Sequence, residues 1–413
     1  MKKHISLVVT LALLLLVQPI VTAQTPAAQN EQPMIFKAGI SNEEKLKVFD
    51  ECWRTVNEKY FDPKFNGVDW IGMREKYRSQ ALAARDKFGL LNVLAQMLNE
   101  LKTSHVFVHL NFKLKRNQVE EKFGGKFDRK KTNIALNYGF GLQHIEGHWV
   151  ITQVDEGSSA QEMGIQKGWI LTHINDKNDE FILESSEGAT ARLRLLDLEG
   201  KEREVTLVCK SYLKPQTQIR EVKALSSGVI YVRFAHFDKY TDDWLENQVK
   251  LNINVPAMII DLRDNSGGLI NTLKNSLDLF FAEKVKIGER IERDADEKDF
   301  RVGGKGKAAY RGKVIVLIDE RSASGAEIFA AAIQDTGRGR ILGRKSAGSV
   351  LTAVSKDLSA GFTLNVAIND YRTIKGVRLE GRGITPDEVL PFTISDFRLN
   401  RDHDLERALE LLK

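Results

Sequence analysis

Two segments of this chain share one design, in which a buried strand runs through a tight turn of small residues into a helix. They are AMIIDLRDNSGGLINTLKNSLDLFF, residues 257–281, and KVIVLIDERSASGAEIFAAAIQ, residues 313–334. Strands that alternate with helices in this way predict an α/β layer. We therefore expect residues 213–395 to form an α/β core, followed by a C-terminal helix over residues 396–413.

The turns of these two units are candidates for an active site. A helix that starts directly after a strand points its N–H groups at negative charge that develops there. The ordinary role of Ser322 or Ser324 at such a turn is to cap the helix that follows. The second turn, DNSGG at residues 264–268, favours chemistry instead, because backbone amides from both turns could together form an oxyanion hole.

The first residues, MKKHISLVVTLALLLLVQPIVTA, have the basic start, apolar stretch and small-residue end of a secretory signal peptide, residues 1–23. We expect cleavage after Ala23 and export, with the periplasm as the destination. An uncleaved membrane anchor is the alternative, but Gln18 and Pro19 interrupt an apolar run that is already short for a span. The mature protein is thus expected to have no stable membrane anchor.

Helical spacing of apolar residues predicts an N-terminal helical region over residues 41–110. This region carries Ser104-His105, two groups able to do proton chemistry, at the joint between its last helix and a following apolar run. Residues 24–40 are predicted as a linker, and residues 111–133 as a charged connector, because mixed-charge runs are usually solvated.

Composition excludes several classes of function. The net charge of +5 is spread over both signs, so no nucleic-acid partner is expected. Cys52 and Cys209 are predicted as two separate buried thiols, although an oxidising compartment permits a bridge between them. No His/Cys/Asp cluster has ligand spacing, and GGKGK at residues 303–307 lacks the Walker pattern, so neither a metal nor another cofactor is expected.

Residues 134–212 contain short β patterns, one short helical piece and a hairpin about Glu199-Gly200. This segment resembles a PDZ domain, although Trp169 stands where that family usually has Asp. The match to the family's carboxylate-binding loop is Tyr138, Gly139, Phe140, Gly141 and Leu142. The resemblance implies binding of a peptide by its free C-terminus, whereas a small β domain that merely packs against its neighbour is the alternative.

The segments DLRDNSGG, DERSASGAEIFAAAIQDTGRGRILG and LEGRGITPDEVLP resemble the carboxy-terminal processing and tricorn proteases of peptidase family S41. The resemblance covers nearly all of the mature chain. It implies an α/β, multidomain fold with an N-terminal helical region, a PDZ-like β domain and a ClpP/crotonase-like catalytic core. It also implies that the nucleophile is the serine three residues before the glutamate of a Ser-x-x-Glu turn, which is Ser324, and that Ser322 is structural.

Two branches of the family differ in the base. One branch uses a lysine 25 residues after the nucleophile, but Ser349 stands there in this chain and Lys345 comes four residues too early. The tricorn-like branch uses a histidine preceded by a serine, with a glutamate near a Glu-Gly-x-Gly motif. The resemblance therefore implies Ser104, His105 and Glu380.

In this arrangement His105 is the general base, and Glu380 orients it through Ser104. Adjacent residues on an extended strand point to opposite faces, so the Ser-His pair must lie in a bend. The ordinary alternatives are a structural histidine and a surface glutamate paired with Arg378 or Arg382. The expected oxyanion donors are the backbone N–H groups of Gly325 and of either Gly267 or Gly268.

The sequence thus predicts an exported serine endopeptidase of the tricorn-like branch, acting on polypeptides that are loosely folded or presented by a free C-terminus. One alternative is a binding protein on the same fold that holds peptides or apolar ligands without cleaving them. The other is a Ser–Lys hydrolase that uses Lys345. Asp261 and Arg263 are expected to hold the glycine-rich turn rather than to react.

Overall fold

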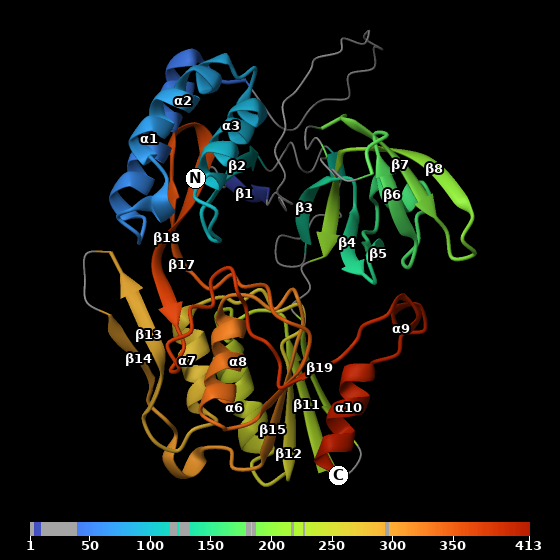
Figure 1. The fold of residues 1–413 in the computed structure, drawn as a ribbon. Coiled ribbons are helices and arrows are strands. Elements are labelled where there is room, and N and C mark those ends of the chain that lie inside the picture. The colour runs from blue at the N-terminus through green and yellow to red at the C-terminus, as the bar shows by residue number, and fades with distance from the viewer. Residues whose placement is uncertain are drawn as a thin grey trace.

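The computed structural model describes the backbone of the following residues: 4–9, 39–115, 122–123, 132–178, 183, 187–215, 219–225, 228–293 and 297–413. Three parts are visible in Figure 1: N-terminal helices, a small β domain and an α/β core. Of the predicted linker, only residues 39–40 are described, and most of the predicted connector lies outside the described residues.

The α/β core is built on a six-stranded sheet with the order β10-β11-β12-β15-β16-β19. All neighbouring strands in it are parallel except β10 and β11. Its strands are β10 Arg220–Ala224, β11 Val229–Phe234, β12 Ala257–Asp261, β15 Lys313–Ile318, β16 Arg340–Gly343 and β19 Glu388–Val389. The predicted α/β layer is therefore confirmed.

Helices cover both faces of this sheet (Figure 1). One face packs against α6 Thr241–Leu251, α7 Ile270–Asp278 and α8 Gly325–Asp335, and the other against α10 His403–Leu412. Successive residues of a strand point to opposite faces, which is why Ile230 belongs to the core under α7 and α8 while Tyr231 belongs to the core under α10. A short helix, α9 Ile394–Arg398, precedes α10, so the predicted C-terminal helix is divided in two.

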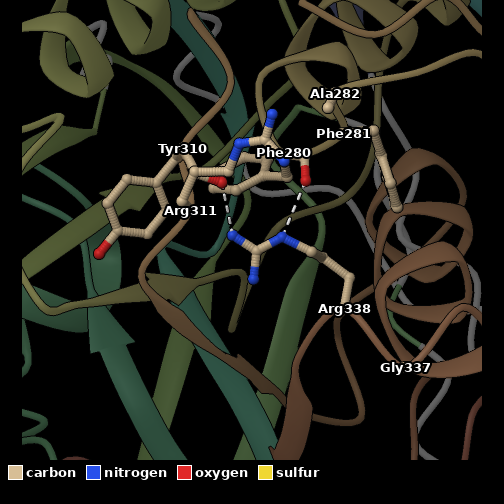
Figure 2. A pocket seen from close by; sticks show the side chains of 7 residues that line it. All are labelled: Phe280, Phe281, Ala282, Tyr310, Arg311, Gly337 and Arg338. Atoms are coloured by element: carbon tan, nitrogen blue, oxygen red, sulfur yellow. Dashed lines mark hydrogen bonds between the residues drawn. The ribbon is translucent and has the colours of Figure 1, made fainter. Parts of the chain in front are cut away.

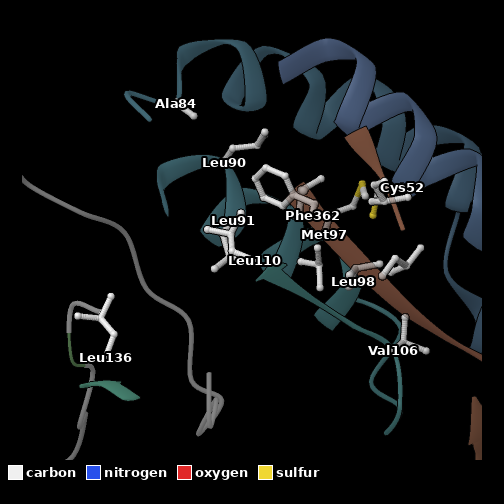
Figure 3. Close-up of a cluster of buried hydrophobic side chains, with 14 of the residues drawn as sticks. Cys52, Ala84, Leu90, Leu91, Met97, Leu98, Val106, Leu110, Leu136 and Phe362 are labelled. Carbon is white, nitrogen blue, oxygen red and sulfur yellow. The ribbon is translucent and has the colours of Figure 1, made fainter. Parts of the chain in front are cut away.

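The N-terminal helices are α1 Asn42–Lys59, α2 Trp70–Ala83 and α3 Lys87–Asn99. They pack on a second six-stranded sheet, of order β1-β2-β18-β13-β14 with β17 paired to β18. Figure 3 shows leucines of α3 gathered around Phe362 of β18 and Leu110 of β2. The strands of this second sheet are β1 His4–Val9, which lies within the predicted signal peptide, and β2 Phe107–Lys115, β13 Val285–Glu292, β14 Lys298–Val302, β17 Thr352–Asp357 and β18 Phe362–Arg372.

This second sheet joins segments that are distant in the sequence. Phe362 of β18 lies opposite Leu110 of β2, so the chain just after Ser104-His105 is hydrogen-bonded to the C-terminal third of the protein. The first five residues of the predicted connector, 111–115, continue β2 and are thus part of this sheet. The helical region therefore docks on strands supplied by the core.

The small β domain, residues 132–215, contains a five-stranded antiparallel sheet of order β4-β5-β6-β7-β8, with β4 at one edge. The predicted hairpin about Gly200 and the short helix, α5 Ser159–Glu162, are both present. The strands of the small β domain are β3 Thr132–Asn137, β4 Phe140–Ile145, β5 His148–Val154, β6 Ile170–Ile174, β7 Thr190–Leu196, β8 Glu202–Val208 and β9 Lys210–Pro215. Strand β3 pairs with β9, apart from the five-stranded sheet.

Cys52 on α1 and Cys209, directly after β8, are two separate buried thiols with no disulfide between them, as the sequence predicts. Burial raises the pKa of the Cys52 thiol to about 12, so this thiol is unreactive at neutral pH. None of the helices in the described part of the chain is long and apolar enough to cross a membrane.

Candidate active site

Ser324 lies at the end of a turn, residues 319–324, that joins β15 to α8 and is called the serine turn below. Its backbone has φ 55° and ψ −116°, a conformation that is rare for a residue with a side chain and costs energy. The Ser324 N–H donates to the Ser349 carbonyl over 2.7 Å and to Glu327 Oε2 over 3.1 Å. The strained backbone is thus held in place by two acceptors.

Ser322 has a different role in the same turn, because its side chain is fully buried. Its hydroxyl donates to the Leu262 carbonyl over 2.7 Å and accepts from the Asp319 N–H over 2.9 Å. The first bond fastens the serine turn to the residue after β12, and the second closes the serine turn on itself. The expectation that Ser322 is structural agrees with these contacts.

The glycine turn, residues 264–268, lies against the serine turn. A Cβ atom on Gly267 would lie 2.6 Å from Ser324 Cβ and 2.7 Å from the Gly325 nitrogen, so a side chain at Gly267 is excluded. The Gly267 N–H donates to Asn265 Oδ1 over 2.9 Å and is therefore already used. Within the described residues, the N–H groups of Gly268 and Gly325 have no such acceptor. Of the two alternatives left open by the sequence, Gly268 is the better donor.

Asp261 and Arg263 lie at the end of β12, just before the glycine turn, and form an ion-pair cluster there. The Arg263 guanidinium contacts Asp261 of β12 at 2.6 Å, and it contacts Asp402 and Asp404 at the start of α10 at 2.7 and 3.0 Å. The two residues thus join the end of β12 to the C-terminal helix. This arrangement fits the holding role that the sequence suggests for them.

Ser104, His105 and Glu380 form one hydrogen-bonded unit, although 276 positions separate the serine from the glutamate. The Ser104 hydroxyl lies 2.7 Å from His105 Nδ1 and donates to Glu380 Oε2 over 2.9 Å. The Ser104 N–H donates to Glu380 Oε1 over 2.7 Å. His105 has φ 58°, and this left-handed bend directs both side chains to one site, as an extended strand would not.

The hydrogen-bonding capacities of this unit fix the tautomer of the histidine. Ser104 has a single hydroxyl proton, which it donates to the Glu380 carboxylate, so its bond to the ring must be one that it accepts. His105 Nδ1 therefore carries the proton, and Nε2 presents a lone pair. Burial also lowers the pKa of His105 to about 4, which keeps the ring neutral at physiological pH.

A linking segment, residues 346–350, joins this unit to the serine turn. The Val350 N–H donates to Glu380 Oε2 over 3.0 Å, while the carbonyl of the preceding residue accepts the Ser324 N–H. The Gly348 carbonyl also accepts the Gly381 N–H over 2.8 Å. Two consecutive backbone positions, Ser349 and Val350, therefore connect Ser324, the expected nucleophile, to Glu380.

Glu327, which sequence reasoning did not single out for the site, anchors the linking segment. Its side chain is fully buried and accepts from the Ser346 hydroxyl over 2.6 Å and from the N–H groups of Gly348 and Ser349 over 2.8 Å each. Burial raises the pKa of this carboxyl, and these hydrogen bonds oppose the shift. The sequence signal that could have identified Glu327 is its place as the glutamate of the Ser-x-x-Glu turn.

The structure does not bring every predicted residue into one network. The described hydrogen bonds include none between His105 Nε2 and the Ser324 hydroxyl, a contact that often tightens only when substrate binds. Lys345 is exposed, and the structure gives it no hydrogen bond to the other described site residues. Glu380 accepts from Ser104 and Val350, whereas Arg378 pairs with Asp370, so the predicted alternative of an Arg378–Glu380 surface pair is wrong.

The predicted carboxylate-binding loop leads into the edge strand β4. Tyr138 is buried, and Gly139, with φ 86°, packs so closely on Ser158 that a Cβ there would lie 1.9 Å from the serine Cβ. The Gly139 N–H donates to Asn137 Oδ1 over 2.7 Å. Trp169, the departure from the PDZ pattern, is buried in the core of the domain. The remaining loop positions are Phe140, Gly141 and Leu142 of β4.

A separate pocket of about 390 Å³ lies beyond the end of α8 and shares no residue with the groups above. Figure 2 shows the Arg338 side chain directed at backbone carbonyls that line it. Arg338 donates to the Phe280 and Tyr310 carbonyls over 2.8 and 2.7 Å, so it binds the loops together. Among the described residues, no group of three or more His, Cys, Asp or Glu side chains could hold a metal ion.

Comparisons with known proteins agree with this architecture. Residues 228–390 match the model of peptidase family S41, and residues 41–99 match the tricorn protease C1 domain. The chain is 26% identical over 396 residues to the carboxyl-terminal-processing protease of Synechocystis sp., covering 89% of this chain and 87% of that protein. It resembles the crystal structure of mature CPAF with a TM-score of 0.66 at 13% identity, covering 90% of this chain and 97% of that one.

A second relative is longer than this chain. The chain is 25% identical over 405 residues to the putative tricorn protease homolog 2 of Streptomyces coelicolor, and the match covers 89% of this chain. It spans only 32% of that relative's length. The region over residues 228–390 therefore belongs to peptidase family S41, a family of serine peptidases, and a segment that matches the tricorn protease C1 domain, residues 41–99, precedes it.

Proposed function

We propose that this protein is an exported serine endopeptidase in which Ser324 is the nucleophile and His105 the general base. The observation that carries the proposal is the Ser104–His105–Glu380 unit, which fixes the base in the tautomer that can accept a proton at Nε2. The linking segment supports it, because one stretch of backbone holds both Glu380 and the serine turn. The residues expected to act together are thus positioned by shared hydrogen bonds.

In the first half of the reaction, the Ser324 oxygen attacks the carbonyl carbon of the scissile peptide bond while His105 Nε2 takes the hydroxyl proton. The carbonyl oxygen becomes an oxyanion, which the Gly268 and Gly325 N–H groups stabilise. The C–N bond then breaks, and His105 passes its proton to the departing amine. The product of this half is an ester between the substrate's acyl group and Ser324.

In the second half, water attacks the ester carbon and gives a proton to His105 Nε2. The ester C–O bond then breaks, and the same proton returns to the Ser324 oxygen, which releases the acid product. In both halves the ring becomes an imidazolium for a short time. Burial opposes that charge, and Glu380, acting through Ser104, compensates it.

The small β domain is proposed to bind the C-terminus of a polypeptide. The support is a short glycine-containing loop that leads into an edge strand, where an extended peptide can add its own backbone hydrogen bonds. The N-terminal residues support export to the periplasm, which stays a prediction. The second candidate function, peptide binding without cleavage, would use this same edge and leave Ser324 unreactive.

Active-site labelling tests the proposed function. A fluorophosphonate is expected to modify Ser324 in the full chain, because in the proposed mechanism His105 activates this serine and the Gly268 and Gly325 N–H groups stabilise the oxyanion. Ser324→Ala should abolish both the labelling and peptide hydrolysis, whereas Ser322→Ala should lower stability but leave a serine to label. Labelling of Ser324→Ala at the wild-type rate, or hydrolysis that survives in it, would place the nucleophile elsewhere.

Peptide binding is tested separately from cleavage, with the Ser324→Ala full-length chain. A peptide with a free C-terminus is expected to bind about tenfold or more tightly than the same peptide with a C-terminal amide, because hydrogen bonds to a charged group contribute about 1.5–3 kcal/mol. Isothermal titration of both peptides measures the difference. Equal affinities would remove carboxylate recognition from the proposal.

A further inference from the structure

Arg321 lies in the serine turn, three residues before Ser324, and its side chain reaches two other parts of the molecule. Its Nη1 contacts Asp264 Oδ1 at 2.9 Å. Its Nη2 donates to the Leu142 carbonyl over 2.9 Å and to Thr152 Oγ1 over 3.3 Å. One guanidinium therefore touches the glycine turn and the small β domain at once.

Asp264, the partner of Arg321 in the glycine turn, is the first residue of this turn, which also carries the proposed oxyanion donor Gly268. Asp264 has φ 59°, a conformation that needs support in a residue with a side chain, and its N–H donates to Asp319 Oδ1 over 3.0 Å. The next residue, Asn265, accepts the Ala323 N–H at its carbonyl over 2.9 Å and the Gly267 N–H at its side chain. Arg321, at 2.9 Å, and Arg233, at 3.4 Å, thus both hold Asp264 at the start of the glycine turn, and Arg321 makes the shorter contact.

The partners in the small β domain lie on its edge. Leu142 belongs to the edge strand β4, next to a bulge between Gly141 and Leu142, and Thr152 belongs to the neighbouring strand β5. Gln143 of the same edge strand donates to Glu320, the residue before Arg321. Two successive residues of the serine turn therefore hold the strand that the proposed peptide ligand would meet.

From these contacts we infer that Arg321 is a positioning residue that ties the glycine turn, and with it the oxyanion donors, to the edge of the small β domain. The inference rests on the proposed function, because it concerns the rate at which Ser324 is acylated. Acylation then depends on where the small β domain sits. The fork geometry matters, since Nη1 and Nη2 are separate nitrogens that reach different partners at the same time, whereas a lysine has a single nitrogen at the end of a flexible stem.

The exposure of these groups separates positioning from stability. The side chains of Arg321 and Asp264 are 37% and 43% exposed, and ion pairs exposed to this degree contribute little to stability. A small displacement of catalytic groups can nevertheless slow a reaction by about 10²-fold. Loss of Arg321 should therefore change the rate of the chemical step much more than the melting temperature.

The test compares Arg321→Ala, Arg321→Lys and Thr152→Val in the full-length chain. The readouts are the rate of Ser324 modification by a fluorophosphonate, kcat and KM for a peptide with an amidated C-terminus, and Tm. Arg321→Ala should lower the labelling rate and kcat about tenfold or more, with KM and Tm nearly unchanged. Arg321→Lys should recover only part of the loss, and Thr152→Val should show a smaller loss of the same kind.

Arg340→Ala is the matched control, because Arg340 also forms an exposed ion pair in the core, with Glu388, but lies outside the site. It should behave as wild type. If Arg321→Ala is labelled as fast as the wild-type chain and keeps the wild-type kcat, the inference is overturned and the proposed function stays intact. A loss of rate that follows a loss of Tm would make Arg321 merely structural. Failure to label the wild-type chain would overturn the proposed function and this inference together.

Discussion

Replacing His105 by alanine is expected to lower kcat by at least about 10²-fold, because a positioned general base contributes about 10²–10⁴. The partly buried ring has its Nδ1 engaged by Ser104, so Nε2 is the atom left to take the Ser324 proton. Lys345→Ala is the control for the Ser–Lys alternative. Lys345 is exposed, and its loss should leave kcat within about twofold of wild type. Steady-state hydrolysis of one peptide by both variants makes the comparison.

A normal rate for His105→Ala together with inactivity of Lys345→Ala would reverse the assignment of the base. The pH profile gives an independent check. Burial lowers the pKa of His105 to about 4, so its neutral, reactive form should persist as pH falls below 6.5. The acid limb of kcat/KM is expected to have a midpoint near pH 4 to 5. A midpoint at 6.5 would indicate a solvated histidine.

The same shift has a consequence for stability with a definite sign. An unfolded histidine has a pKa of about 6.5, so between pH 6.5 and about 4 the unfolded chain binds a proton at His105 that the folded chain does not. The contribution of this group is fully present above pH 6.5 and is lost as pH falls toward 4. His105→Ala should therefore flatten this part of the stability curve.

The second large effect is expected at Glu380. Its two oxygens accept three donors: the Ser104 N–H, the Ser104 hydroxyl and the Val350 N–H. Glu380→Gln replaces one acceptor by a donor, so at least one of these bonds is lost, and the imidazolium loses its compensating charge. We expect kcat/KM to fall by about tenfold or more, with the chain still folded. Circular dichroism and peptide hydrolysis of the variant measure the two quantities.

Ser104→Ala is expected to produce a similar loss, because it also removes the acceptor that fixes the His105 tautomer. The two substitutions act through one hydrogen-bonded unit, so kcat/KM of the double variant should be hardly lower than that of the less active single variant. The double-mutant cycle on kcat/KM should give a coupling of about 1.4 kcal/mol for each tenfold of shared effect. Two independent losses that multiply would show that the glutamate does not act through Ser104.

Some of the site was predictable because its signals are local. The run of small residues around Ser324, placed between a buried strand and a helix, predicts the turn whichever way the rest of the chain folds. The glycine turn is predictable for the same reason. Gly267 approaches Ser324 so closely that no side chain fits, and glycines mark such approaches in a sequence.

Other features depend on tertiary contacts and leave no local signal. Strand periodicity places Ser104 and His105 on opposite faces, and only the φ of 58° at His105 brings them together. The choice between Gly267 and Gly268 follows from Asn265, whose side chain occupies the first amide. The linking segment reaches Ser324 and Glu380 through backbone N–H and carbonyl groups, which carry no sequence signal, whereas Ser346 contributes a side-chain bond to Glu327.

The helical region that delivers His105 packs on strands from the C-terminal third of the chain, and Glu380 lies beyond those strands. With the roles proposed above, a chain emerging from the ribosome or through a translocon presents its base first, its nucleophile much later and its relay glutamate last. Partial chains therefore lack a complete set of reacting groups until nearly all of the polypeptide has appeared. With these roles, the order of synthesis itself delays proteolysis until the chain is nearly complete.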